Sequence, residues 1–238
     1  MFKKCYVIPT RMACNADCVF CSSRFREAEF AGLPEHMAVD ADFSRVLHSL
    51  TSEPVLKYEI TGGGEPFLNR HLQAIVNSIK SALPSAYLKV YTNGHIFRRI
   101  EGIDELNISV AHWDTSLNNA IFRLHQPRNI FSVLDFFSPE RTYKLRLSIP
   151  MIKGGIDDPA KAREMIDKTC LHVDGYVLRP LFPFTPQRAD YDGEFHIDDP
   201  RVELDYGACG HDNVLLWMPN NKTYRGWNLA RERSCGSV

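Results

Sequence analysis

Cys14-Asn15-Ala16-Asp17-Cys18-Val19-Phe20-Cys21 is the stretch around which the rest of the sequence is organised. Its three thiols lie close together, and an aromatic side chain directly precedes the last of them. Thiolates are preferred ligands of iron–sulfur clusters and of zinc. Three cysteines on one tight loop can bind three irons of a cubane cluster, which leaves the fourth iron open to another ligand. A structural zinc site uses four protein ligands, and no Cys or His pair follows at zinc-finger spacing.

A helix face is the structural alternative for these cysteines. Positions 14, 18 and 21 also have the i, i+4, i+7 spacing of a small apolar helix stripe. Because three cysteines would rarely share such a stripe by accident, a cofactor site is the better interpretation.

The cysteine motif resembles that of the radical S-adenosylmethionine (SAM) enzymes, in which three cysteines and an aromatic residue occur in this order. The resemblance implies a 4Fe–4S cluster on Cys14, Cys18 and Cys21, with Phe20 at the cofactor. SAM then occupies the open iron through its amino and carboxylate groups. The resemblance also implies an enzyme that cleaves SAM reductively to methionine and a 5′-deoxyadenosyl radical, which abstracts a hydrogen atom from the substrate. An electron donor such as flavodoxin or ferredoxin is the implied partner.

Segments rich in strand-forming residues alternate with segments of helical periodicity along most of the chain. We expect strands at 5–10, 55–61, 86–92, 105–111, 143–149 and 173–178, the fifth ended by Pro150. We expect helices at 40–50, 72–79, 117–124, 130–137 and 159–169, the first capped by Asp40 and the last preceded by Asp158. This alternation predicts a parallel α/β architecture. Six βα units are too few for a closed eight-stranded barrel, so we expect a partial (βα)6 TIM-like barrel.

The character of the sequence changes after Phe182, where proline and acidic residues become frequent. We therefore expect a barrel core at 1–185 and a C-terminal extension at 186–238 that caps the open side of the barrel. Asn220-Asn221 resembles the turn of a β-hairpin. The aromatic residues of the extension, Trp217, Tyr224 and Trp227, suggest that it helps to cover the site.

A glycine-rich segment follows the second expected strand, at the end where parallel barrels gather their reactive residues. The sequence there is Gly62-Gly63-Gly64-Glu65-Pro66, and glycine lets the backbone approach a ligand closely. The segment resembles the glycine–glycine–glutamate element of the radical SAM family. By that resemblance Gly63, Gly64 and Glu65 contact SAM. The additional Gly62 leaves the register open by one residue.

Other polar residues near strand ends are weaker candidates. The family commonly places polar groups near SAM where Ser109 and Ser148 lie, but such serines can equally be core polar groups. Arg146 and Arg179, if they point inward, can meet the SAM carboxylate or a substrate anion, or form structural ion pairs.

Two short segments also follow strands. Thr92-Asn93-Gly94 resembles a recurring element of the family or is an ordinary turn, and His112-Trp113-Asp114 fits substrate binding or a surface loop. Two roles remain open for Cys209 and Cys235, which can act as a hydrogen donor in catalysis or as ligands of a second cluster.

Composition sets outer limits on the class of protein. The chain has 238 residues, a formal charge of −1 and 44% hydrophobic residues, which is typical of a globular protein of one domain. The absence of a basic excess does not favour a nucleic-acid partner. The sequence shows neither a signal core nor an apolar run of membrane-spanning length, so we expect no membrane partner. Seven cysteines, three of them in one loop, fit a reducing cytoplasm better than a disulfide framework.

These features leave three functional hypotheses. The first is modification of a peptide or small natural-product substrate by radical SAM chemistry. The second is modification of a nucleotide or modified-base precursor by the same chemistry. The third is a non-catalytic metal- or cluster-binding regulatory module, which the glycine-rich segment argues against because a structural metal does not need one.

Overall fold

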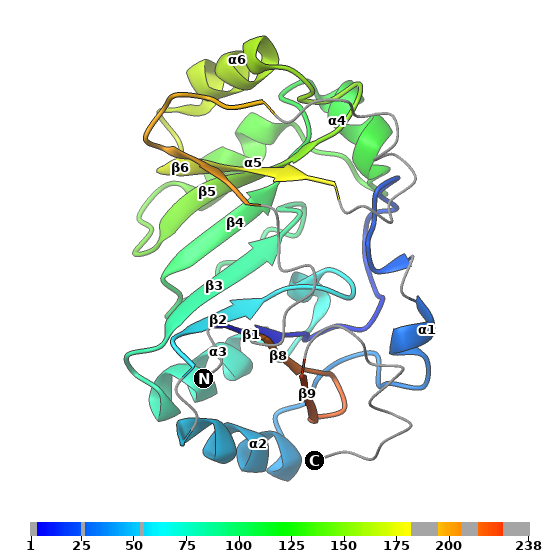
Figure 1. Ribbon diagram of the computed structural model, residues 1–238, viewed down its shortest axis with the longest axis vertical. Helices are drawn as coiled ribbons and strands as arrows, with labels where there is room; N and C mark the ends of the chain where they lie inside the picture. The colour runs from blue at the N-terminus through cyan, green and yellow to red at the C-terminus, as the bar shows by residue number, and fades with distance from the viewer. Residues whose placement is uncertain (1–3, 25–26, 53–54, 182–194, 206–213, 226–238) are drawn as a thin grey trace.

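A curved, mostly parallel β-sheet forms the centre of the molecule (Figure 1). The computed structural model describes residues 4–24, 27–52, 55–181, 195–205 and 214–225. The strands lie in the order β7-β6-β5-β4-β3-β2-β1-β8-β9, and only the β8–β9 pair is antiparallel. The strands are β1 (Lys4–Val7), β2 (Lys57–Ile60), β3 (Tyr87–Thr92), β4 (Glu105–Ser109), β5 (Lys144–Met151), β6 (Gly175–Pro180), β7 (Val202–Leu204), β8 (Val214–Trp217) and β9 (Thr223–Arg225).

Helices connect most of the neighbouring strands from β1 to β6. The described helices are α1 (Glu27–Phe30), α2 (Ala41–Thr51), the 3-10 helix η2 (Pro66–Leu68), α3 (Leu72–Ala82), α4 (Thr115–Phe122), α5 (Ile130–Phe137) and α6 (Pro159–Thr169). Residues 93–104, between β3 and β4, contain no helix. Six parallel strands in sequence order, most of them joined by helical crossovers, confirm the expected α/β fold and make it a partial TIM-like barrel. No described helix has the length and apolar character needed to cross a membrane.

Local sequence signals set the ends of the helices. The Asp40 carboxylate accepts a hydrogen bond from the amide of Phe43 and so begins α2, and Asp158 does the same for α6 through the amide of Lys161. The expected end of the fifth strand at Pro150 is wrong, because β5 continues to Met151. The partner strand β4 has already ended opposite Ser148, so on that side Pro150 interrupts no ladder.

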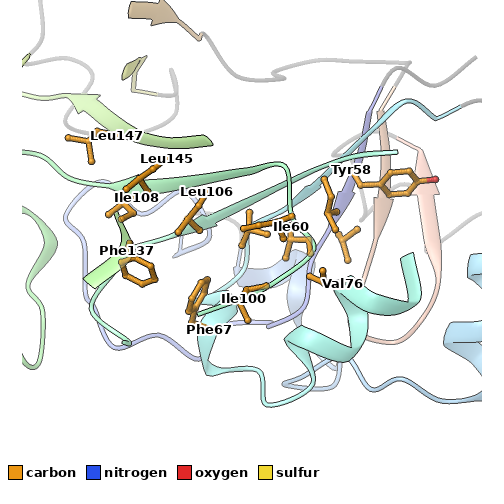
Figure 2. Packing of buried hydrophobic residues seen from close by; sticks show 14 of the residues in the cluster. Tyr58, Ile60, Phe67, Val76, Ile100, Leu106, Ile108, Phe137, Leu145 and Leu147 are labelled. Atoms are coloured by element: carbon orange, nitrogen blue, oxygen red, sulfur yellow. The ribbon is translucent and has the colours of Figure 1, made fainter. Parts of the chain in front are cut away.

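The main hydrophobic core lies between the helices and the outer face of the sheet. Alternate residues of each strand point to it, because side chains of a strand alternate between its two faces. Figure 2 shows this packing across neighbouring strands and helices, with Tyr58, Ile60, Leu106, Ile108, Leu145 and Leu147 from the sheet meeting Phe67, Val76, Ile100 and Phe137. The residues between them in the strands therefore point to the inner, concave face.

The described parts of the C-terminal extension add strands to both edges of the barrel sheet. β7 pairs with β6 at one edge, and β8 pairs with β1 at the other. The expected hairpin is confirmed by the antiparallel β8–β9 pair, with Asn221 at a positive φ of 53° in the turn. The suggestion that Trp217 helps to cover the site is wrong, since it is fully buried in the main core and stacks on Phe43 at 4.5 Å. Cys209, Cys235 and Trp227 lie outside the described residues.

Candidate functional site

The cysteine loop follows β1 and runs across the carboxyl ends of the strands toward α4 (Figure 1). Its backbone pairs with the chain at the end of α4. The amide of Asp17 donates to the carbonyl of Phe122 at 3.0 Å, and the amide of Val19 donates to the carbonyl of Ile121 at 3.1 Å. The structural alternative of a helix stripe at positions 14, 18 and 21 does not hold, because residues 14–21 form no helix.

All three cysteines of the loop are free and partly buried. Cys14 and Cys18 pack with Phe20 against a separate apolar cluster that includes Ile121 and Phe122. The Phe20 ring meets the Phe122 ring edge to face at 5.4 Å. Burial, with the nearby Glu65 charge, raises the pKa of Cys14 to about 11, and burial also raises the pKa of Cys18. Burial thus favours the protonated form of Cys14 and Cys18, and a metal that binds these two thiols must displace their protons.

The glycine segment after β2 packs directly on the backbone that leads into the cysteine loop. A Cβ atom on Gly63 would lie 1.9 Å from the carbonyl oxygen of Thr10, and one on Gly64 would lie 1.9 Å from that of Ala13. The amide of Gly64 donates to the Thr10 carbonyl at 3.1 Å. Only glycine fits here, and the need for it comes in this structure from the contact between the two loops.

Glu65 is the centre of a buried hydrogen-bond network at the ends of β2 and β3. Its carboxylate accepts from the amide of Phe67 at 3.0 Å, from the hydroxyl of Thr92 at 2.7 Å and from the amide of Asn93 at 2.8 Å. Its own amide donates to the Ala13 carbonyl at 2.8 Å. Burial raises the pKa of Glu65, although these donors and Arg98 oppose that effect.

The third loop at this edge, after β3, is joined to the cysteine loop. Asn93 donates from its side-chain amide to the side-chain oxygen of Asn15 at 2.6 Å. The structure therefore brings together the three sequence segments that follow β1, β2 and β3. The sequence analysis left two interpretations open for the segment at 92–94, a family element or an ordinary turn. In the structure this segment contacts both of the other loops.

Glu35 is a site residue that the sequence analysis missed. Its carboxylate accepts hydrogen bonds from the amides of Met12 and Ala13 and from the guanidinium of Arg11. These contacts lower the pKa of Glu35 in spite of the opposing effect of burial. The contact joins residues far apart in the sequence, so no local pattern announced it.

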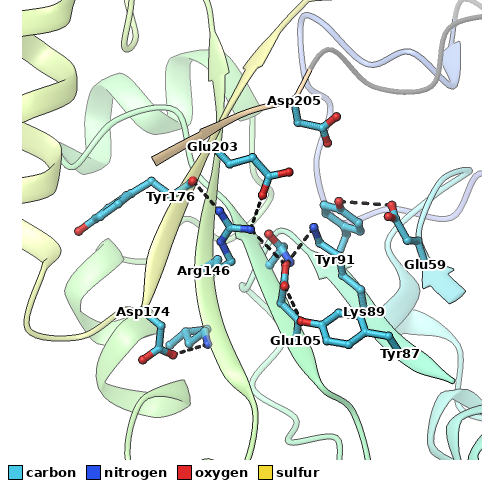
Figure 3. Close-up of polar contacts among 12 residues, drawn as sticks. Glu59, Tyr87, Lys89, Tyr91, Glu105, Arg146, Asp174, Tyr176, Glu203 and Asp205 are labelled. Carbon is cyan, nitrogen blue, oxygen red and sulfur yellow. Dashed lines mark hydrogen bonds and ion pairs between the residues drawn. The ribbon is translucent and has the colours of Figure 1, made fainter. Parts of the chain in front are cut away.

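The inner face of the sheet carries a network of paired charges (Figure 3). Glu105 accepts from Lys89 at 2.9 Å, from Tyr87 at 2.8 Å and from the side-chain amide of Asn107 at 2.6 Å. These interactions outweigh burial and lower the pKa of Glu105 to about 2. Arg146 joins the network at 3.8 Å from Glu105, which makes it an inward-pointing ion-pair residue.

The remaining candidates lie in the carboxyl halves of β4, β5 and β6. Ser109 and Ser148 are register partners on neighbouring strands, with Ser148 buried and Ser109 half-buried. Arg179 lies 3.4 Å from Asp205, and its guanidinium is 5.1 Å from the centre of the Tyr91 ring. Both expected inward arginines, Arg146 and Arg179, are thus paired with acidic residues.

The segment at 112–114 begins α4. The Asp114 carboxylate caps the helix by accepting from the amides of Ser116 and Leu117 at 2.9 and 3.0 Å. His112 is buried and its Nδ1 accepts from the amide of Asp114 at 2.9 Å. These contacts give two of the three residues a structural role at a helix start.

The donor set of the cysteine loop fits an iron–sulfur cluster. Among the residues that the structure describes, no group of three or more His, Cys, Asp and Glu is placed to hold one metal ion. A cubane cluster makes a different demand, because each cysteine binds a different iron. Three protonatable thiols on one partly buried loop, backed by an apolar cluster and fixed to two neighbouring loops, meet that demand.

Comparison with known proteins gives sequence relatives of moderate similarity. No family model matches the chain. It is 29% identical over 158 residues to a GTP 3′,8-cyclase of Lactiplantibacillus plantarum, covering 61% of this chain and 45% of the relative. It is 25% identical over 168 residues to a UPF0026 protein of Helicobacter pylori, covering 66% and 54%. The chain therefore spans about half the length of the curated relatives that it matches.

Solved structures share the fold over more of the chain. SuiB of Streptococcus suis, in complex with S-adenosylmethionine, has a TM-score of 0.67 and 16% identity, covering 93% of this chain and 60% of SuiB. A radical SAM methyltransferase of Sphaerobacter thermophilus has a TM-score of 0.56 and 17% identity, covering 75% and 56%. These structures share the fold that the resemblance in the cysteine motif implies, and in sequence the chain is similar to a GTP 3′,8-cyclase.

Proposed function

We propose that the chain binds a 4Fe–4S cluster through Cys14, Cys18 and Cys21 and uses it to cleave SAM reductively. When bound, cluster and SAM together supply a 5′-deoxyadenosyl radical, which abstracts a hydrogen atom from the substrate. The observation that carries the proposal is the convergence of the cysteine loop with Gly63, Gly64 and Glu65 at the carboxyl end of one parallel sheet.

The environment of Glu65 supports binding of a cationic group beside the cysteine loop. The residue is 3% exposed, and no ion pair of its carboxylate occurs within the described ranges. Its three hydrogen-bond donors are all neutral groups, and Arg98 acts on it without forming an ion pair. A buried carboxylate is costly without a positive partner. The amino group of SAM is a partner of the required charge.

Several roles follow for the chain's own residues in this proposal. Glu65 orients the amino group, and Gly63 and Gly64 bring the second loop close enough for that contact. Phe20 and its apolar neighbours exclude water from one side of the cysteines. Ser109 and Ser148 are placed as neighbours on β4 and β5 and are proposed to contact SAM.

The proposed substrate is a peptide or a small natural product. SuiB, which shares the fold, is also known in complex with a precursor peptide, SuiA, with a TM-score of 0.67 and 15% identity. A nucleotide or modified-base precursor is the second candidate, favoured by the similarity to GTP 3′,8-cyclase. The proposed electron donor is a flavodoxin or ferredoxin, and the proposed location is the cytoplasm. The division into a core at 1–185 and a capping extension at 186–238 stays a prediction.

The proposal is tested on anaerobically reconstituted protein reduced with dithionite. We expect about four irons per chain and formation of 5′-deoxyadenosine from SAM. Replacement of Cys14, Cys18 or Cys21 by alanine is expected to abolish both, because each thiolate holds a different iron. Cys170→Ala is the matched control, since Cys170 follows α6 and lies outside the loop.

Two results would reject the proposal. One is a 4Fe–4S spectrum with full SAM cleavage in any of the three loop variants. The other is zinc in place of iron with no deoxyadenosine formed, which would favour the regulatory module. Cleavage assays with a precursor peptide or GTP then separate the two substrate classes.

A further inference from the structure

The segment 10–13, which enters the cysteine loop, is held on one side by the chain at 35–37. Thr10 and His36 form an antiparallel bridge. The amide of Arg11 donates to the Glu35 carbonyl at 2.8 Å, and the amide of Met37 donates to the Pro9 carbonyl at 2.8 Å. These backbone bonds place the Glu35 side chain next to the last residues before Cys14.

The two carboxylate oxygens of Glu35 serve different partners. Oε1 accepts from the backbone amides of Met12, at 3.0 Å, and of Ala13. Oε2 accepts from Nε and Nη2 of Arg11 at 3.1 and 3.0 Å. Hydrogen bonds to an ionised carboxylate are stronger than neutral ones. Oε1 therefore fixes the backbone of residues 12 and 13, while Oε2 pairs with the positive charge of the Arg11 side chain.

The opposite side of segment 10–13 is fixed by the glycine segment. The amide of Gly64 donates to the Thr10 carbonyl, and the amide of Glu65 donates to the Ala13 carbonyl at 2.8 Å. At Ala13 the amide and the carbonyl are thus both bound, to Glu35 and to Glu65 respectively. The residue before the first cysteine has little freedom left.

We infer that Glu35 is a positioning residue that sets the backbone before Cys14 so that the cysteine loop is shaped in advance for its cofactor. This inference rests on the proposed function for the identity of the cofactor. Groups that orient metal ligands from behind typically change metal retention about 10- to 100-fold when they are removed. The half-exposed position of Glu35 means that its loss costs few packing contacts.

The first test measures the loop without cofactor, by hydrogen exchange of the amides of Met12 and Ala13 in the apo protein. Glu35→Ala removes both oxygens and is expected to speed exchange at these amides about tenfold or more, since it removes a charged hydrogen-bond acceptor. Glu35→Gln keeps an oxygen that can accept from both amides and is expected to stay within about threefold of the wild type. Arg11→Ala removes only the Oε2 partner and is expected to behave like Glu35→Gln.

The second test measures release of iron from reconstituted protein to a chelator. The same order is expected, with about tenfold faster release from Glu35→Ala and near-normal release from Glu35→Gln and Arg11→Ala. Asp199→Ala is the control, because Asp199 also accepts from a guanidinium and a backbone amide, both of Arg201, before β7. It is expected to leave both rates unchanged.

Equal rates in Glu35→Ala and Asp199→Ala, in both experiments, would overturn the inference. If Glu35→Ala does not fold, Glu35→Asp replaces it, because the shorter side chain keeps the charge but withdraws it from the amides. Exchange at Met12 and Ala13 must then exceed that of Arg11→Ala. If the wild type binds no iron, the proposed function fails, while the exchange experiment still tests Glu35.

Discussion

Two buried glutamates, Glu65 in the loops and Glu105 on the inner face of the sheet, are satisfied in different ways. Glu105 is 5% exposed, and the hydrogen bond from the Asn107 amide together with the ammonium of Lys89 lowers its pKa to about 2. Glu65 is 3% exposed, its described hydrogen-bond donors are all neutral, and burial raises its pKa. The network of Glu105 includes a positive charge, whereas that of Glu65 has no positive charge in contact among the residues that the structure describes. This difference distinguishes a structural network from one that fits a cationic ligand.

The largest expected effect on folding stability lies in the network of Glu105. Lys89→Ala leaves a buried carboxylate with reduced compensation and is expected to lower the free energy of unfolding by about 3–5 kcal/mol. Urea unfolding of the apo protein measures this. Arg45→Ala is the control, because the Arg45–Asp42 pair is exposed and such pairs contribute about 0.2–1 kcal/mol. A loss of under about 1 kcal/mol for Lys89→Ala would remove the contrast between the two networks.

The pH dependence of unfolding provides the next effect, with opposite signs for the two residues. The pKa of Glu105 is lowered from 4.5 to about 2. Its stabilising contribution to the free energy of unfolding is therefore present above pH 4.5 and is lost as the pH falls toward 2. At roughly 1.4 kcal/mol per pH unit, the full contribution is about 3 kcal/mol. The pKa of Glu65 is raised, so its contribution is full below 4.5 and is lost as the pH rises through the folded-state pKa.

The variants Glu105→Gln and Glu65→Gln separate these two contributions. Measured by denaturant unfolding from pH 3 to 8, Glu105→Gln should flatten the acid limb of the stability curve. Glu65→Gln should gain stability relative to the wild type as the pH rises above 4.5. The same direction of change in both variants would show that the two glutamates are not electrostatically different.

A smaller effect on folding stability is expected where the glycine segment contacts the backbone that leads into the cysteine loop. Gly63 has a φ of +64°, and its Cβ position overlaps the backbone of Thr10 and Arg11. Gly32 has a φ of +74° with nothing within 4 Å of its Cβ position. Both alanine variants share the backbone strain, so the difference between them isolates the overlap, about 1–3 kcal/mol. Thermal unfolding of both apo variants tests this, and equal melting temperatures would contradict the close contact.

The smallest effect concerns the bond between the cysteine loop and the loop after β3. Asn15→Ala removes the acceptor of the Asn93 side chain and is expected to cost about 1 kcal/mol in unfolding free energy. Asn77→Ala, which removes an exposed bond to Gln73, is expected to cost less. If both variants cost the same, the bond between the loops adds nothing to the network of Glu65.

Much of the fold and part of the site followed from local sequence signals. Asp40 and Asp158 announced helix starts, and periodicity located α3 and α5. The sequence motifs also placed the cysteine and glycine segments after consecutive strands. Such signals are local, since a cap or a periodic stripe depends on residues within one or two turns.

The rest depended on contacts between distant segments, which periodicity cannot report. Glu35 contacts Met12 and Ala13, from which it is separated in the sequence by α1. No local sequence pattern distinguishes it from other glutamates in loops. Trp217 lies in the C-terminal extension, which we expected to cover the site. Because β8 pairs with β1, the Trp217 side chain points into the main core instead. We expected Pro150 to end its strand, because proline has no amide hydrogen to donate to a neighbouring strand. Since the pairing with β4 has already ended at Ser148, the missing donor breaks no hydrogen bond on that side.

The pairing of β8 beside β1 determines when this sheet can be completed during synthesis. β1, which leads into the cysteine loop, has β2 at one edge and β8, beginning at Val214, at the other. Until the ribosome has released residues 214–217, one edge of β1 remains an open row of backbone donors and acceptors. The contact has a very large sequence separation, which slows folding. Of the described strands of this sheet, the one that leads into the cysteines is made before the others and is among the last to be fully enclosed.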